Sequence, residues 1–193
     1  MSKSYNRGDL IKRCNAQIQE QLLEVTTLFS SVNEDLLITS PLPVKWSAKQ
    51  CLEHLNLTIQ LYLPRIKVAL KSAEPSSTLV LKRGIVGSFM INSLRKSNVS
   101  SNKPRAMKTF KQLQPGVTGK SSIAVVIEFS EALNELYTCL NESQNKNIDE
   151  LKITSAAGPI LKLRLSDVFP FLLEHNQRHI NQATRAVELC KKH

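Results

Sequence analysis

The chain of 193 residues has few aromatic residues (5%), only six glycines and only eight prolines. This scarcity argues against a protein of many short strands, which needs a tight turn every ~8–12 residues. Long apolar runs are also missing, since no stretch approaches the ~18 residues of a membrane span. Apolar residues make up 41% and charged residues 22%, which excludes a disordered chain. We expect one helical domain over residues 1–193, outside the membrane.

The sequence also lacks a disulfide framework and a signal peptide. Its four cysteines lie far apart and form no C-x-x-C pair, which is typical of reduced thiols. The first nine residues are polar and contain no apolar core of a secretory signal. We therefore expect a soluble, cytoplasmic protein without disulfides. The cysteines are Cys14, Cys51, Cys139 and Cys190.

Acidic residues are absent between Glu74 and Glu128, although the formal net charge is +10. Basic residues in this segment would attract the phosphates of a nucleic acid. However, no known DNA- or RNA-binding motif is present, and Phe89 and Phe110 are the only aromatic residues of this segment that could stack on bases. We favour an anionic small-molecule substrate or a solvated basic face, with nucleic-acid binding as the alternative. The nine basic residues are Lys82, Arg83, Arg95, Lys96, Lys103, Arg105, Lys108, Lys111 and Lys120.

The glycine spacing argues against a nucleotide hydrolase. Residues 115–121 (PGVTGKS) resemble the end of a phosphate-binding loop, but the position of its first glycine holds Gln114. No apolar strand precedes this segment, as such a loop requires.

Apolar residues recur every three or four positions in four long stretches, the mark of amphipathic helices. Ser47 and Gln50 predict a capping box at the start of the second helix, and Pro64 predicts a bend within it. Ser166 predicts the N-cap of the last helix, where Pro170 is tolerated because the first amides lack helical partners. The four helices are expected over about residues 8–31, 47–72, 122–143 and 166–191.

The connection of about residues 75–120 is too long for a plain loop, so we predict a short helix near Ile85 to Lys96 and extended chain elsewhere. Four amphipathic helices of this length pack naturally as a bundle. The fold class we predict is all-α: a four-helix bundle whose long basic crossover, between the second and third helices, carries the short extra helix.

Two histidines lie on the otherwise apolar face of the last helix. His175 and His179 are one turn apart, so both imidazoles can bind a single ion. For one inward histidine, a hydrogen-bonded core role is the better interpretation. A pair favours metal, because a divalent cation satisfies both rings at once. His54, on the core side of the second helix, is a candidate for the third nitrogen.

Three motifs together resemble the DinB-like superfamily of metal-binding four-helix bundles. They are Trp46-Ser-Ala-Lys-Gln-Cys-Leu-Glu-His54-Leu55, the basic segment ending Lys103-Pro104…Phe110-Lys111, and Phe171-Leu-Leu-Glu-His175-Asn-Gln-Arg-His179-Ile-Asn-Gln182. The resemblance covers nearly the whole chain and implies that His54, His175 and His179 bind a divalent metal, usually zinc or nickel. Three imidazoles with an open position are typical of a catalytic metal site.

The resemblance also implies the chemistry. Such a metal acts on a water or a thiol, and relatives include thiol-dependent transferases and isomerases as well as proteins described as hydrolases. We therefore expect a metal-dependent hydrolase or transferase, with a low-molecular-weight thiol as a candidate cosubstrate and its catalytic residues unknown. A Gly-x-Ser-x-Gly motif is absent from the sequence. The alternative is a non-catalytic metal-binding or interaction bundle, including a homodimer.

Residues beside the histidines add little to the mechanism. Glu53 and Glu174 each precede a histidine by one residue, about 100° away around the helix, and we interpret them as solvated surface charges. Gln182 is expected either to contact the site or to be a surface amide. Arg178 is expected to be exposed, with attraction of an anionic substrate as the alternative.

Two further residues lie near His54 in the sequence. Cys51, one turn earlier, could join a metal as a thiolate, but we expect a buried thiol. Trp46, the only tryptophan, is expected to be a packing anchor at the start of the second helix, with a place in the pocket wall as the alternative.

Overall fold

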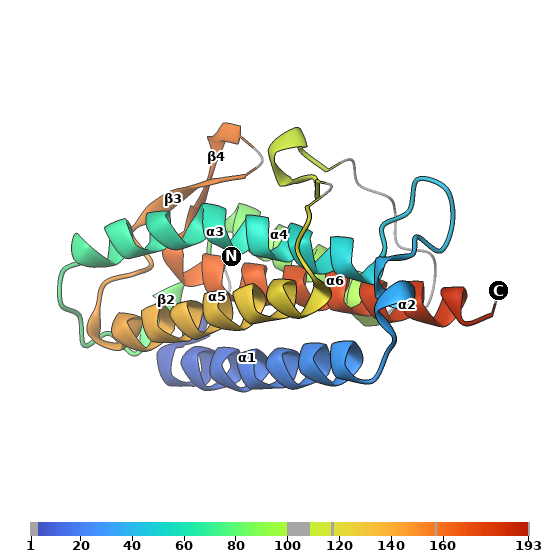
Figure 1. The fold of residues 1–193 in the computed structure, drawn as a ribbon. Coiled ribbons are helices and arrows are strands. Elements are labelled where there is room, and N and C mark those ends of the chain that lie inside the picture. Colours follow the sequence, from blue (N-terminus) through green and yellow to red (C-terminus); the bar gives the residue numbers. More distant parts are fainter. Residues whose placement is uncertain (1–3, 100–108, 117, 157, 193) are drawn as a thin grey trace.

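Four long helices dominate the computed structural model, which describes residues 4–99, 109–116, 118–156 and 158–192 (Figure 1). In the ribbon they lie side by side. Helix α3 packs against α5 and α6, and α1 packs against the same two helices. The prediction of a mostly helical chain is confirmed. The long helices are α1 (Arg7–Ser30), α3 (Ala48–Lys71), α5 (Ser122–Glu142) and α6 (Leu165–Cys190).

The start of α3 follows from its first residues. The Ser47 hydroxyl accepts a hydrogen bond from the Gln50 amide at 3.2 Å, and the Gln50 side chain accepts one from the Ser47 amide at 3.0 Å. This confirms the predicted capping box, which satisfies amides that lack helical partners. One apolar stripe on the helix then enters the core. Its buried members are Cys51, Leu55, Ile59, Tyr62, Ile66 and Leu70.

The shorter helices connect the long ones. The predicted crossover helix is present as α4, which begins at the expected residue and packs against α6. Among the described residues, no helix combines the length and apolar character needed to cross a bilayer. The short helices are α2 (Glu34–Ile38), α4 (Ile85–Val99) and the single 3-10 turns η1 (Lys111–Leu113) and η2 (Ser143–Asn145).

Two small antiparallel sheets were not expected from the sequence. The first pairs Tyr5 with Leu81, and the second pairs Ile153 with Leu163. Each pairing buries apolar side chains. β1 (Ser4–Asn6) and β2 (Val80–Lys82) have three residues each and β3 (Lys152–Ser155) has four, which is too short to show a clear alternating pattern. The fourth strand is β4 (Gly158–Arg164). The described residues thus add four short strands to the mostly helical fold, which stays consistent with the all-α prediction.

The predicted cap of α6 is wrong. The helix begins at Leu165, and its N-cap residue is Arg164, whose side chain makes no capping bond. The Ser166 hydroxyl instead donates to the Lys82 carbonyl at 3.1 Å. Pro170 is then the sixth helical residue, so the unpaired amides of the first turn do not explain why it is tolerated. Lys82, the last residue of β2, thus fixes the start of α6 through a long-range bond.

Candidate metal centre

The three predicted histidines come together between two helices. His54 lies in the second turn of α3, and His175 and His179 lie in the middle of α6. One ligand atom from each ring lies within 4.8 Å of the other two. His54 and His179 are 3% and 8% exposed, so the group is largely shielded from water. Among the described residues, these side chains form the one group of three or more His, Cys, Asp or Glu close enough to share an ion.

His54 is oriented by a backbone carbonyl. Its Nδ1 lies 2.7 Å from the Leu113 oxygen. Because a carbonyl oxygen only accepts hydrogen bonds, Nδ1 carries the proton and donates it. In the neutral ring this leaves a lone pair on Nε2. A metal-binding histidine commonly donates its second ring nitrogen to a carbonyl in this way.

The spacing between two imidazoles fits a shared ion. The Nε2 atoms of His54 and His175 are 3.4 Å apart. A direct hydrogen bond from an N–H group typically spans roughly 2.7–3.2 Å. Two nitrogens on one tetrahedral zinc ion, each ~2.0–2.1 Å from it, are separated by about 3.3–3.4 Å. The observed distance between the two Nε2 atoms therefore matches two ligands of one ion better than a direct hydrogen bond.

Burial keeps all three imidazoles neutral. It is the first cause lowering the pKa of His54, His175 and His179. The pKa of His175 falls to about 3, and repulsion from His54 is the second cause. The Nδ1 atoms of His175 and His179 are buried without a hydrogen-bond partner in the described part of the chain. Neutral imidazoles are the form that binds metal, so the donors fit a divalent cation.

The lowered pKa values predict how the metal-free protein responds to acid. The unfolded histidines take up protons near pH 6.5, whereas the folded ones resist protonation, so the folded state loses stability as the pH falls below about 6.5. Each such histidine contributes up to about 1.4 kcal/mol per pH unit. Urea unfolding in EDTA between pH 7 and 4 measures this slope. His175→Gln should make it shallower, and an unchanged slope would contradict the assignment.

Aromatic rings line the histidine group. The centre of the Trp46 ring lies 4.9 Å from the centre of the His54 ring and 5.8 Å from that of the His179 ring. Phe171 lies 6.1 Å from the His175 ring. Trp46 is therefore part of the wall of the site as well as a packing residue. Because it bridges ligand candidates on two helices, it helps to hold their rings in place.

Cys51 is a buried thiol, as predicted. It is fully shielded from solvent, and burial raises its pKa to about 12. It does not belong to the group of close ligand atoms. A protonated thiol is a poor zinc ligand, because only the thiolate binds the ion. Cys51 thus has the environment of a core residue.

The interpretation of Glu53 and Glu174 as solvated charges is wrong. They are only 7% and 8% exposed. Glu53 accepts a hydrogen bond from the Thr118 hydroxyl, and Glu174 accepts from Arg95 Nε at 2.6 Å and from Asn98 Nδ2 at 3.2 Å. Neither belongs to the histidine group. Their rotation away from the histidines was predicted correctly, but chain from elsewhere covers both carboxylates.

Arg178 and Gln182 both lie close to the histidines. Arg178 is partly buried, against the expectation of an exposed side chain, and its Nη1 donates to the Ser97 hydroxyl. Its positive charge contributes to the lowered pKa of His175 and His179. A hydrogen bond with Gln182 partly opposes this shift at His179. Of the two alternatives expected for Gln182, this favours contact with the site over a free surface amide.

The basic crossover is partly neutralised within the molecule. Lys82, Arg95 and Lys120 form ion pairs with Glu150, Glu174 and Glu128. Arg83 is buried, and its guanidinium carbon lies 4.5 Å from the centre of the Tyr5 ring. These contacts reduce the charge available to a nucleic acid. Three further basic residues of this segment, Lys103, Arg105 and Lys108, lie outside the described residues.

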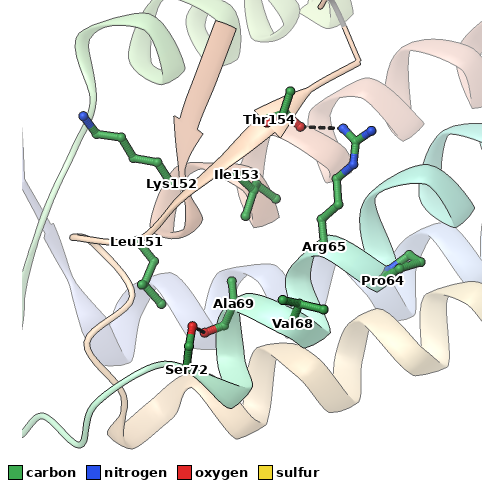
Figure 2. Close-up of a pocket in the computed structure, with 9 residues that line it drawn as sticks. All are labelled: Pro64, Arg65, Val68, Ala69, Ser72, Leu151, Lys152, Ile153 and Thr154. Atoms are coloured by element: carbon green, nitrogen blue, oxygen red, sulfur yellow. Dashed lines mark hydrogen bonds between the residues drawn. The ribbon is translucent and has the colours of Figure 1, made fainter. Parts of the chain in front are cut away.

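A separate hollow lies between the second half of α3 and β3 (Figure 2). Arg65 reaches across it, and its Nη1 donates to the Thr154 carbonyl at 2.7 Å. Its lining residues include no histidine, cysteine or carboxylate, so it offers no cluster of metal ligands. They are Pro64, Arg65, Val68, Ala69, Ser72, Leu151, Lys152, Ile153 and Thr154.

Comparison with known families agrees with the fold and the histidine group. The family model of the DinB superfamily matches residues 17–183. The chain belongs to the DinB superfamily, which confirms the resemblance seen in the sequence motifs. No curated protein and no solved structure matches it significantly.

Proposed function

We propose that this protein is a metal-dependent enzyme that holds one divalent cation, zinc or nickel, through His54, His175 and His179. The observation that carries the proposal is the convergence of three neutral imidazoles, of which His54 and His179 are buried and His175 is partly buried, with ligand atoms within 4.8 Å of one another. Three protein nitrogens leave an open position for a substrate, as in catalytic zinc sites. The four long helices serve as the scaffold of a four-helix bundle that places two helices opposite each other at the metal.

When bound, such a cation supplies a Lewis acid that lowers the pKa of a water or thiol nucleophile. The residues of the chain have other tasks. Leu113 holds the His54 ring through its carbonyl, and Trp46 and Phe171 exclude water from the imidazoles. The nearby charge of Arg178 favours an anionic substrate. Four free cysteines support a reducing, cytoplasmic setting in which a low-molecular-weight thiol is available.

Activity should therefore depend on the cation. We expect turnover in one of two screens: small thiols with electrophiles, which reports a transferase, or ester and amide substrates, which reports a hydrolase. The activity should disappear with a chelator and return with zinc or nickel. Turnover that persists in fully metal-free protein would contradict the mechanism. Inactivity across both screens would favour the non-catalytic metal-binding alternative.

A further inference from the structure

The turn that contains Leu113 and orients His54 belongs to a segment whose position depends mainly on contacts with the rest of the molecule. This covering segment comprises residues 109–120, of which the structure describes all but 117. Its only helical part is η1, a single turn of three residues. One turn has little stability of its own, because helix nucleation costs more than its few hydrogen bonds return. Contacts with the rest of the molecule must therefore fix the position of the Leu113 carbonyl.

Those contacts gather on the first turns of α3, beside His54. The Thr118 hydroxyl donates to the Glu53 carboxylate, and Lys49 Nζ donates to the Thr118 carbonyl at 3.4 Å. Lys49 Nζ also lies 3.8 Å from Glu53 Oε1. The buried side chain of Leu113 provides a further anchor. Glu53, the residue next to His54 on α3, thus holds the segment whose Leu113 carbonyl accepts the hydrogen bond from His54.

Burial makes the contacts among Lys49, Glu53 and Thr118 stronger than an ordinary surface contact. The side chains of Lys49 and Glu53 are 13% and 8% exposed, whereas those of Lys120 and Glu128, which anchor the end of the same segment to α5, are 47% and 30% exposed. An exposed ion pair contributes little, but a buried carboxylate that loses its donor carries a large desolvation cost. The geometry of the segment therefore depends on Thr118 and Glu53 more than on Lys120.

We propose that Thr118 and Glu53 are positioning residues for the metal centre: they dock the covering segment so that the Leu113 carbonyl holds the His54 ring with Nε2 free for a ligand. This proposal rests on the proposed function. Neither residue touches the cation. They act through Leu113 and His54, which makes His54 the one ligand candidate of the three whose ring is locked by a carbonyl before any metal binds.

The test removes the Thr118 hydroxyl at constant shape. In the Thr118→Val variant, zinc affinity measured by competition with a chromogenic chelator should fall about tenfold, the lower end of the effect of outer-shell changes. Thr118→Ser keeps the hydroxyl and should restore wild-type affinity. The matched control is Thr138→Val, because the Thr138 hydroxyl donates only within α5, to the Asn134 carbonyl at 3.0 Å. This control should bind zinc normally.

A second measurement needs no metal. In metal-free protein, the Nδ1 proton of His54 should give a slowly exchanging NMR signal in the wild type and the Thr118→Ser variant, and a weakened one in Thr118→Val. Unchanged affinity and signal in Thr118→Val would overturn the positioning role, as would an equal loss in Thr118→Ser or Thr138→Val. If the wild type binds no zinc, the proposed function fails, and the His54 signal alone decides the positioning proposal.

Discussion

Replacing His179 with alanine is expected to abolish tight metal binding. The wild type should hold about one divalent ion per chain, since three imidazoles form one site. Two nitrogens would remain in the variant, and the described part of the chain offers no other carboxylate, thiol or imidazole close enough to replace the third. The loss should exceed the ~10–100-fold effect of changing an outer-shell partner. Elemental analysis of protein purified without added metal measures the content directly.

Trp46 supplies a second measurement of the same effect. It is the only tryptophan in the chain, and its ring lies 5.8 Å from that of His179. Nickel bound at the histidines should quench its fluorescence in the wild type and fail to do so in the variant. His179→Gln, which preserves more of the side-chain volume, should behave in the same way. Cys51→Ser is the control and should keep its metal. A folded His179→Ala protein with full metal content would refute the triad.

The sequence predicted the long helices well because their signals are local. The apolar stripe from Cys51 to Leu70 and the Ser47–Gln50 box each depend on residues within a few turns. Helical spacing predicted that His175 and His179 share one face of the last helix. The prediction that His54 lies opposite them and completes a set of three required the family resemblance. Periodicity alone put His54 on the core side of a helix but did not say which helix faced it.

Features that depend on distant chain were missed. Glu53 and Glu174 lie off the histidine face, as their positions predicted, but the covering segment and α4 bury them. The Leu113 carbonyl has no signal in the sequence, because every residue carries a backbone carbonyl. The Ser166 hydroxyl has the chemistry of an N-cap but finds an acceptor at Lys82 instead. Local patterns identified these side chains, and tertiary packing decided their partners.

The buried carboxylate of Asp167 shows the same dependence on distant chain. It is fully shielded, accepts from the Gly84 amide at 2.7 Å and accepts from the Tyr5 hydroxyl at 3.1 Å. Burial raises its pKa, and the bond from Gly84 partly opposes this rise. Through these bonds, the first turn of α6 holds both the N-terminal strand and the start of α4. The close approach of α4 requires a glycine at position 87.

Gly87→Ala is expected to destabilise the protein by about 2–4 kcal/mol, because overpacking and a broken buried hydrogen bond both cost free energy. A Cβ at Gly87 would lie 2.5 Å from Asp167 Oδ2 and 2.6 Å from its Cβ and Cγ, so the carboxylate or α4 must move. Better helix propensity recovers only about 1 kcal/mol. Urea unfolding measures the net change. Gly116→Ala is the control, because no atom of the described residues lies within 4 Å of its Cβ position, and its stability should change by less than about 0.5 kcal/mol. Equal stability of the two variants would show that α4 does not depend on its contact with Asp167.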